Sequence, residues 1–275
     1  MRSVLALPMA FFLSLSSAVA QDTPACSSCA AETTAQSQTQ EAGAAFLTRL
    51  SLLAGWAYGR AQQGVVASGT VSRLDSQGRE SEPETIKIEM TAARKLRLEI
   101  GSDQLIVSNA VATRKMGGAS RAALMLTHVA ISQIAPYFPF LTDLSATNDP
   151  DVQVGETSTA TINGEAAIGV VVHRSFAANV PFRAAREKSS PLKIWISEKT
   201  GLPVKVDFVR LATDNWNVPI TYSLYYSAWS QVDGVLVPMQ IDEGIEPRVF
   251  LRYRFSSIAF NNQIPDSDFS AGGAN

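Results

Sequence analysis

Apolar and polar residues alternate with a period of two over most of the chain after residue 63. The alternation is clearest in the segment 222–241, YSLYYSAWSQVDGVLVPMQI, where it continues on both sides of Asp233 and Gly234. An Asp-Gly pair between two alternating segments favours a hairpin with a two-residue turn. We therefore expect Val232 to lie opposite Val235 in an antiparallel pair of strands.

The same register assigns the remaining residues of the hairpin to two faces. Tyr226 is expected opposite Ile241, on an apolar face. Trp229 is expected opposite Pro238, on the other face. A shift of one residue would move every side chain to the wrong face, so the pattern itself specifies this pairing.

Other segments show the same alternation and predict further half-buried strands. Parallel strands are usually apolar on both faces, so alternation of this kind indicates an antiparallel sheet. The predicted strands cover residues 65–71, 86–90, 96–100, 105–108, 111–115, 152–162, 167–173, 192–197, 204–211 and 249–256.

Two segments show a helical pattern instead. Within residues 41–60, Phe46, Leu50 and Leu53 recur at steps of three and four residues, which is typical of one helix face. Residues 117–135 are apolar on nearly all sides and long enough for a second helix. The polar segment 179–191 is expected to be a surface loop.

A large sheet with one apolar face and only two helices favours a curved architecture. Two helices cannot cover about nine to eleven strands that stay flat, and large twisted sheets tend to curl. The sequence thus predicts a mainly β (α+β) fold: a large curved antiparallel sheet, or half-barrel, with two or so helices packed in or over its concave face.

The N-terminus has the composition of a secretory signal peptide. Residues 1–20 contain one positive charge, an apolar run and the small-residue end Ala18-Val19-Ala20. We expect cleavage after Ala20 and a periplasmic or secreted protein, because the apolar run is too short to span a membrane. The expected organisation is a flexible leader at 21–40, a single domain at 41–270 and a tail at 271–275.

Both cysteines of the chain, Cys26 and Cys29, lie in the leader. They lack the strand and helix of a redox motif, the additional ligands of a zinc site and the histidine of a haem attachment site. Five residues separate the predicted cleavage site from Cys26, which argues against lipidation. A local disulfide in an oxidising compartment is the preferred interpretation.

Composition and motifs do not indicate catalysis, a cofactor or nucleic-acid binding. The chain contains 23 basic and 25 acidic residues, for a net charge of −2. No motif of a nucleophile elbow, zinc protease, phosphate loop or dinucleotide site occurs in it. His128 and His173 are interpreted as structural, no metal is expected, and the pair Asp242-Glu243 is interpreted as solvated loop charge.

The order of several segments resembles the LolA/LolB-like lipoprotein-carrier superfamily. These segments are LKIWISEKTGLPVKVDF (192–208), YYSAWSQVDGVLVPMQI (225–241) and FSSIAFNNQIPDSDF (255–269), together with SGTVSRL (68–74) and RKLRLEI (94–100). The chain looks most similar to a secreted branch of that superfamily. The resemblance implies a half-barrel with helices as a lid, and binding of lipid, an acyl chain or a lipoprotein on the concave face.

Candidate binding residues follow from the apolar face of the predicted sheet. The candidate floor consists of Ile86, Ile88, Leu96, Leu98, Leu224, Tyr226, Val237, Met239, Leu251 and Tyr253, and the candidate lid of Phe46, Leu50, Leu53, Met125 and Val129. The same residues could instead form a permanent core. An envelope sensor or protein-interaction module is therefore the alternative to a hydrophobic-cargo binder, and the chain is expected to be monomeric.

Overall fold

The structure is a computed structural model that describes residues 43–48, 50, 64–91, 95–108, 110–138, 151–261 and 263–270. The predicted signal peptide, the cysteines of the leader, Leu53 and the last five residues lie outside the described residues. Within the described ranges, no helix combines the length and the apolar composition needed to cross a bilayer.

The described residues form one sheet of thirteen strands with a few short helical segments. Residues 43–48 and 50 are helical. The other elements are β1 (Gly64–Arg73), β2 (Glu84–Met90), β3 (Leu96–Ile100), β4 (Asp103–Ser108), β5 (Val111–Lys115), β6 (Ala123–Leu124), α2 (Thr127–Ile131), β7 (Val152–Ile162), β8 (Glu165–Arg174), α3 (Arg183–Ser189), β9 (Leu192–Ser197), β10 (Pro203–Leu211), β11 (Pro219–Val232), β12 (Val235–Ile245), β13 (Arg248–Asn261) and η3 (Asp266–Phe269).

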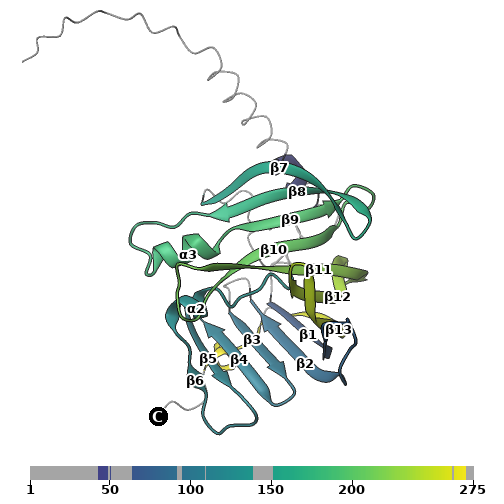
Figure 1. Cartoon of the computed structure of the whole chain (residues 1–275). Coiled ribbons are helices and arrows are strands. Elements are labelled where there is room, and N and C mark those ends of the chain that lie inside the picture. The colour runs from purple at the N-terminus through teal and green to yellow at the C-terminus, as the bar shows by residue number, and fades with distance from the viewer. Residues whose placement is uncertain are drawn as a thin grey trace, which may run out of the picture.

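The sheet consists of two antiparallel meanders joined through the first and the last strand. Its order is β6-β5-β4-β3-β2-β1-β13-β12-β11-β10-β9-β8-β7, so β6 and β7 are the two edges. Figure 1 shows a strongly bent sheet, in which β7–β10 form one part and β1–β6 the other, with α2 and α3 at one margin. The predicted mainly β fold with a large curved antiparallel sheet is confirmed.

The hairpin predicted at residues 222–241 forms with the expected register. Val232 pairs with Val235 and Tyr226 with Ile241. Asp233 and Gly234 have φ values of 49° and 84°. Positive φ at both central residues is the geometry of the two-residue turn that an Asp-Gly pair favours.

The predicted orientation of Trp229 is wrong. Its ring lies 6.1 Å from the ring of Tyr226, and its side chain packs against the main core. Ala228, just before it, has a φ of 52°, and neither Ala228 nor Met239 takes part in the pairing of β11 with β12. The left-handed residue interrupts the alternation of side chains, so the period of two does not hold across it.

Two other segments also differ from the prediction. Residues 117–135 contain only the five-residue α2 and the short edge strand β6, and the predicted loop at 179–191 contains α3. Pro136 explains part of the first difference, because the residue before a proline is disfavoured in the helical conformation. Tyr137 and Phe138, which follow Pro136, are fully buried in the core and hold this part of the chain against the sheet.

The core fills most of the space inside the bend of the sheet. Tyr137, Phe138, Tyr253, Ile88 and Leu47 are among the largest side chains that are fully buried. The cluster extends over strands of both meanders and includes the helical residues near 47. The concave side is therefore largely a packed interior.

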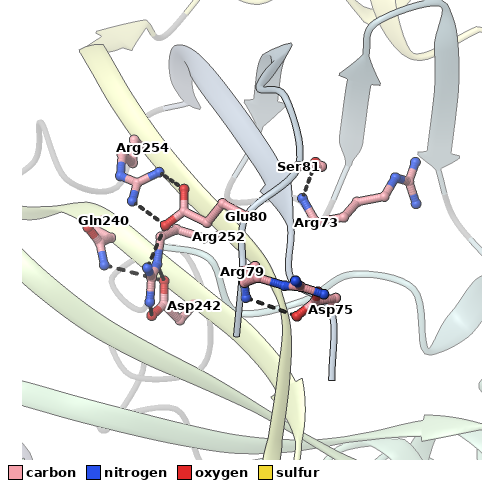
Figure 2. A network of polar contacts seen from close by, with 9 residues as sticks. All are labelled: Arg73, Asp75, Arg79, Glu80, Ser81, Gln240, Asp242, Arg252 and Arg254. Atoms are coloured by element: carbon pink, nitrogen blue, oxygen red, sulfur yellow. Dashed lines mark hydrogen bonds and ion pairs between the residues drawn. The ribbon is translucent and has the colours of Figure 1, made fainter. Parts of the chain in front are cut away.

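Charged side chains on the opposite face of the sheet hold neighbouring segments together. Arg252 donates two hydrogen bonds to Asp242, of 2.8 and 2.7 Å, and a third of 2.7 Å to Glu80 in the β1–β2 connection (Figure 2). Arg254 adds two bonds of 2.7 Å to the same Glu80 carboxylate. Paired guanidinium and carboxylate groups of this geometry fix orientation as well as charge.

Candidate functional site

A cavity of about 240 Å³ lies between the two parts of the bent sheet. Its walls come from β1, β3–β5 and β10–β13 and from the segment 125–138, which follows β6 along the chain. The lining residues are Arg73, Leu98, Ile100, Asp103, Gln104, Leu105, Arg114, Met125, Gln133, Tyr137, Arg210, Tyr222, Glu243, Phe250, Leu251 and Tyr253.

The inner end of the cavity contains a buried ion pair. Nη1 of Arg210 lies 2.6 Å from Oε1 of Glu243, whose side chain is only 2% exposed. The other carboxylate oxygen accepts hydrogen bonds from Tyr253 at 2.7 Å and Tyr137 at 3.5 Å. A buried carboxylate needs this many partners, because its lost hydration must be replaced by charge and hydrogen bonds.

Arg210 is positioned by aromatic rings as well as by its counter-ion. Its guanidinium carbon lies 4.4 Å from the ring centroid of Tyr222 and 5.1 Å from that of Phe208. Burial is the largest single influence on the pKa of Arg210 and lowers it, but Glu243 and the surrounding tyrosines together outweigh burial, and the pKa ends above the usual value. The guanidinium is therefore permanently charged. Its Nε has no hydrogen-bond partner among the described residues.

The phenol groups around this ion pair remain neutral. Burial is the largest cause that raises the pKa of Tyr137, Tyr226 and Tyr253, and the nearby negative charge of Glu243 raises it further. A neutral phenol can donate a hydrogen bond. Tyr137 and Tyr253 thus donate to the Glu243 carboxylate, whereas Tyr226 donates to the carbonyl oxygen of Pro136.

The outer part of the cavity combines an apolar wall with exposed charge. Leu98, Leu105 and Met125 provide apolar surface. The side chain of Arg73 is 67% exposed, and its Nε lies 3.7 Å from Oε1 of Glu84. Such an arrangement suits an amphipathic molecule better than a purely apolar one, because ligand sites are mostly apolar with a few placed polar groups.

Hydrogen bonds attach the segment 125–138 to β10, to β11 and to the connection between them. Nε2 of His128 lies 3.1 Å from the carbonyl oxygen of Ala212, and the hydroxyl of Ser132 accepts a bond of 3.0 Å from the Leu211 amide. Tyr226 donates to the carbonyl oxygen of Pro136. These bonds hold the segment across the concave side, where it covers the core and one wall of the cavity.

Only part of the predicted floor lines this cavity. Leu98, Leu251 and Tyr253 do so. Met239 is partly buried against the core. The other predicted floor residues are at most 5% exposed and belong to the packed core: Ile86, Ile88, Leu96, Leu224, Tyr226 and Val237.

The predicted lid residues are divided between separate places. Met125 lines the cavity, and Val129 is buried with 4% exposure. Phe46 and Leu50 line a different cavity of about 280 Å³, next to Ile168 and the β9–β10 turn. The lid residues that the structure describes therefore lie at separate places, and of these only Met125 lines this cavity.

The polar end of the cavity was missed by the sequence analysis. Glu243 was interpreted as a solvated charge, which is wrong, because its side chain is almost fully buried. A signal was present, since Ile241 and Glu243 lie two residues apart on the same face of one strand. Phe208 and Arg210 have the same spacing in β10. A charged residue in phase with an apolar face indicates a buried partner.

Neither histidine belongs to a metal site in the part of the chain that the structure describes. No group of three or more histidine, cysteine or acidic side chains in these ranges could hold a metal ion. His128 is instead directed at the backbone carbonyl groups of Ala212 and Thr213. His173 lies in β8, where it pairs with Gln153.

Comparisons with solved structures find the same fold in proteins of very different sequence. A Vibrio parahaemolyticus domain, described as an outer membrane lipoprotein-sorting protein, matches with a TM-score of 0.54 and 10% identity over 84% of this chain and 97% of that chain. A DUF1329 family protein from Desulfovibrio piger matches with the same four values. A LolA superfamily protein from Nitrosomonas europaea has a TM-score of 0.47 and 11% identity, covering 79% and 97% of the two chains.

The comparisons of sequence find no such relative. No protein-family model and no curated protein matches this chain. At about 10% identity the structural matches establish architecture and leave activity open. The bent antiparallel sheet, its strand pairing and these matches together show that the chain has a LolA-like fold.

Proposed function

We propose that this protein is exported to the bacterial periplasm, where it binds a hydrophobic or amphipathic molecule, such as a lipid or an acyl chain, in the cavity between β3–β5 and β10–β13. The observation that carries the proposal is the composition of that cavity. Leu98, Leu105 and Met125 offer apolar surface, and the Arg210–Glu243 pair forms a polar inner end. The predicted signal peptide supports the location.

The size of the cavity restricts how the ligand is held. Its volume of about 240 Å³ lies just below the ~300–1,000 Å³ of typical ligand pockets. It accommodates part of an acyl chain, so a longer chain requires the segment 125–138 to move away from the sheet. Burial of about ten CH₂ groups would contribute roughly 8 kcal/mol toward that movement.

Identification of bound material tests the proposal directly. The protein, purified after export without detergent, is extracted with organic solvent, and the extract is analysed by mass spectrometry. We expect acyl species in a fixed ratio to protein. A fluorescent fatty acid then serves as the probe for binding measurements.

Cavity-filling variants show where the probe binds. Leu105→Trp fills part of the cavity and should weaken probe binding about tenfold, because buried apolar contacts are lost. Leu236→Trp is the matched control, since Leu236 is also partly buried but does not line the cavity. Equal binding by both variants would exclude this cavity as the site.

A second candidate function is an envelope sensor or protein-interaction module. It is favoured by the packed core, because seven of the ten predicted floor residues are buried there. Under this alternative, neither copurifying acyl species nor probe binding would be observed. Either result therefore separates the two candidates.

A further inference from the structure

Exposed apolar side chains gather at the margin of the sheet that carries α2 and α3. We refer to Leu124, Leu126, Phe182, Trp216 and Val218 as the α2–α3 patch. These side chains are between 39% and 74% exposed. The other large apolar side chains that are exposed in the described ranges are Val111, Met116 and Ile245.

The patch is assembled from three segments that interact with one another. Phe182 and Trp216 line a shallow cavity of about 430 Å³ together with Thr127, His128, Arg183, Ala184 and Ala185. His128 is directed at the carbonyl oxygen of Ala212, and Lys188 donates to the side chain of Asn217 at 3.2 Å. The β10–β11 connection is thus linked to both helices, which lie side by side at one margin in Figure 1.

The backbone at Phe182 has an unusual conformation. Its φ and ψ are 56° and 33°, in the left-handed region, and its side chain is 58% exposed. This region favours glycine, and a bulky residue there is an outlier. Strain of this kind is found where a residue is held for a function, and here it accompanies a phenyl ring exposed to solvent.

Basic side chains flank the apolar ones. Arg183, Arg186 and Lys188 belong to α3, and Glu187 and Asp214 are the acidic residues of α3 and the β10–β11 connection. The three positive and two negative charges sum to +1, whereas the whole chain has a net charge of −2. Nε of Arg183 lies 2.7 Å from Oε1 of Glu187, but the Arg183 side chain is 48% exposed and can still contact an anion. Nζ of Lys188 lies 4.9 Å from the ring centroid of Trp216, so positive charge and aromatic surface are adjacent.

We propose that the α2–α3 patch docks the protein on the surface of a bilayer that contains anionic lipids. Phe182, Trp216 and Leu126 enter the headgroup region, and Arg183 and Lys188 contact lipid phosphate. Aromatic and aliphatic side chains beside Lys and Arg are the composition that binds at this interface. None of the five patch residues lines the cavity of the proposed function, so vesicle binding and probe binding test the two proposals separately.

Vesicle binding tests the docking proposal. The protein purified after export is mixed with vesicles of phosphatidylglycerol and phosphatidylcholine, or of phosphatidylcholine alone, and the bound fraction is measured by flotation. We expect binding to the anionic vesicles, weaker binding at high salt because charge is screened, and little binding to phosphatidylcholine. The double variant Phe182→Ser, Trp216→Ser should bind at least about tenfold less.

Matched variants control for exposure and charge. Ile245→Ser removes an apolar side chain with the same 39% exposure as Trp216, outside the patch, and should bind as the unmodified protein does. Arg183→Gln with Lys188→Gln should remove the preference for anionic vesicles. Lys199→Gln with Arg248→Gln changes the net charge equally, in the β9–β10 turn and at the start of β13, and should retain that preference.

Three outcomes would overturn the proposal. They are the absence of binding to anionic vesicles, equal binding by the Phe182→Ser, Trp216→Ser variant, and equal binding to both vesicle types. Sedimentation velocity tests the alternative that a second copy of the chain binds to the patch. A dimer that this double variant abolishes, without vesicle binding by the unmodified protein, would assign the patch to a second copy of the chain. Circular dichroism verifies that each variant is folded.

Discussion

At the scale of single residues, the side chains that deviate from the apolar pattern are the informative ones. Arg210 and Glu243 are directed at the interior from two strands that are otherwise apolar on that face. Each alone would be a buried charge without a counter-ion, which is costly. Together they form an ion pair, with Nη1 of Arg210 at 2.6 Å from Oε1 of Glu243. Each of the two groups therefore stabilises the fold only when the other is present.

Removal of Glu243 alone should destabilise the protein severely. Glu243→Ala leaves the Arg210 guanidinium without its counter-ion, and we expect the free energy of unfolding to fall by about 3–5 kcal/mol. Arg210→Met combined with Glu243→Leu should cost less than the single change, because apolar side chains of similar volume need no counter-charge. Urea denaturation followed by circular dichroism measures both, and a double variant as unstable as the single one would contradict this explanation.

The Glu80 carboxylate should make a pH-dependent contribution to stability. Hydrogen bonds from Arg254, and next from Arg252, lower the pKa of Glu80 to about 2. Because this lies below the usual value of 4.5, the contribution is complete above that value and disappears as the pH falls toward 2. Its size should be below about 1 kcal/mol, since the group is exposed to solvent.

A comparison of variants isolates this contribution. Glu80→Gln should be less stable than the unmodified protein at pH 6, and the difference in urea midpoint should shrink as the pH is lowered from 5 to 3. Glu82→Gln, an exposed neighbour outside the network of Figure 2, is the control. A difference that stays constant over this pH range would show that Glu80 does not act through its charge.

At the scale of elements, the close approach of β1 to β13 determines whether the two meanders form one sheet. The register of this pair shifts at Gly69. A Cβ on Gly69 would lie 2.0 Å from the carbonyl oxygen of Arg254 and 2.7 Å from Cα of Phe255. Both neighbours are backbone atoms, so a flexible side chain cannot relieve the overlap.

Gly69→Ala should therefore weaken the junction between the meanders. We expect a loss of at least about 2 kcal/mol in the free energy of unfolding, because backbone must move or the pairing must break. Gly155→Ala is the control, since its Cβ would lie 3.4 Å from its nearest neighbour, an ordinary contact. Thermal unfolding of both variants measures the difference, and equal stability would contradict the assigned packing.

The segment 125–138 shows why helix prediction failed for part of the chain. Its apolar residues face in nearly all directions, which a helix pattern and an irregular buried segment share. In the structure the segment lies between the two parts of the sheet, and Tyr137 and Phe138 are fully buried in the core. The side chains of Ser132 and His128 and the carbonyl oxygen of Pro136 instead make hydrogen bonds to Leu211, Ala212 and Tyr226.

At the scale of the whole molecule, one continuous core should produce one unfolding transition. The buried cluster joins strands of both meanders. The thirteen strands are paired without interruption from β6 at one edge of the sheet to β7 at the other. We expect tryptophan fluorescence and far-ultraviolet circular dichroism to give coincident urea transitions, because no part can lose its packing alone. Two separated transitions would show that the meanders unfold as independent units.

The sequence by itself determined the local features of the fold. Alternation identified the strands, and Asp233-Gly234 determined the register of the β11–β12 hairpin, because side chains in a strand change face at every residue. The number of strands relative to helices then indicated that the sheet must curve. These features depend on neighbours in the chain, so a linear pattern contains them.

The tertiary structure alone decided the pairing of β1 with β13, the extent to which the core fills the bend, and the meeting of Arg210 with Glu243. These contacts join residues far apart in the sequence. A period of two predicts which face a side chain occupies, but its partner across the interior depends on how the whole sheet bends. The same bend separates the predicted floor residues of the packed core from those that line the cavity.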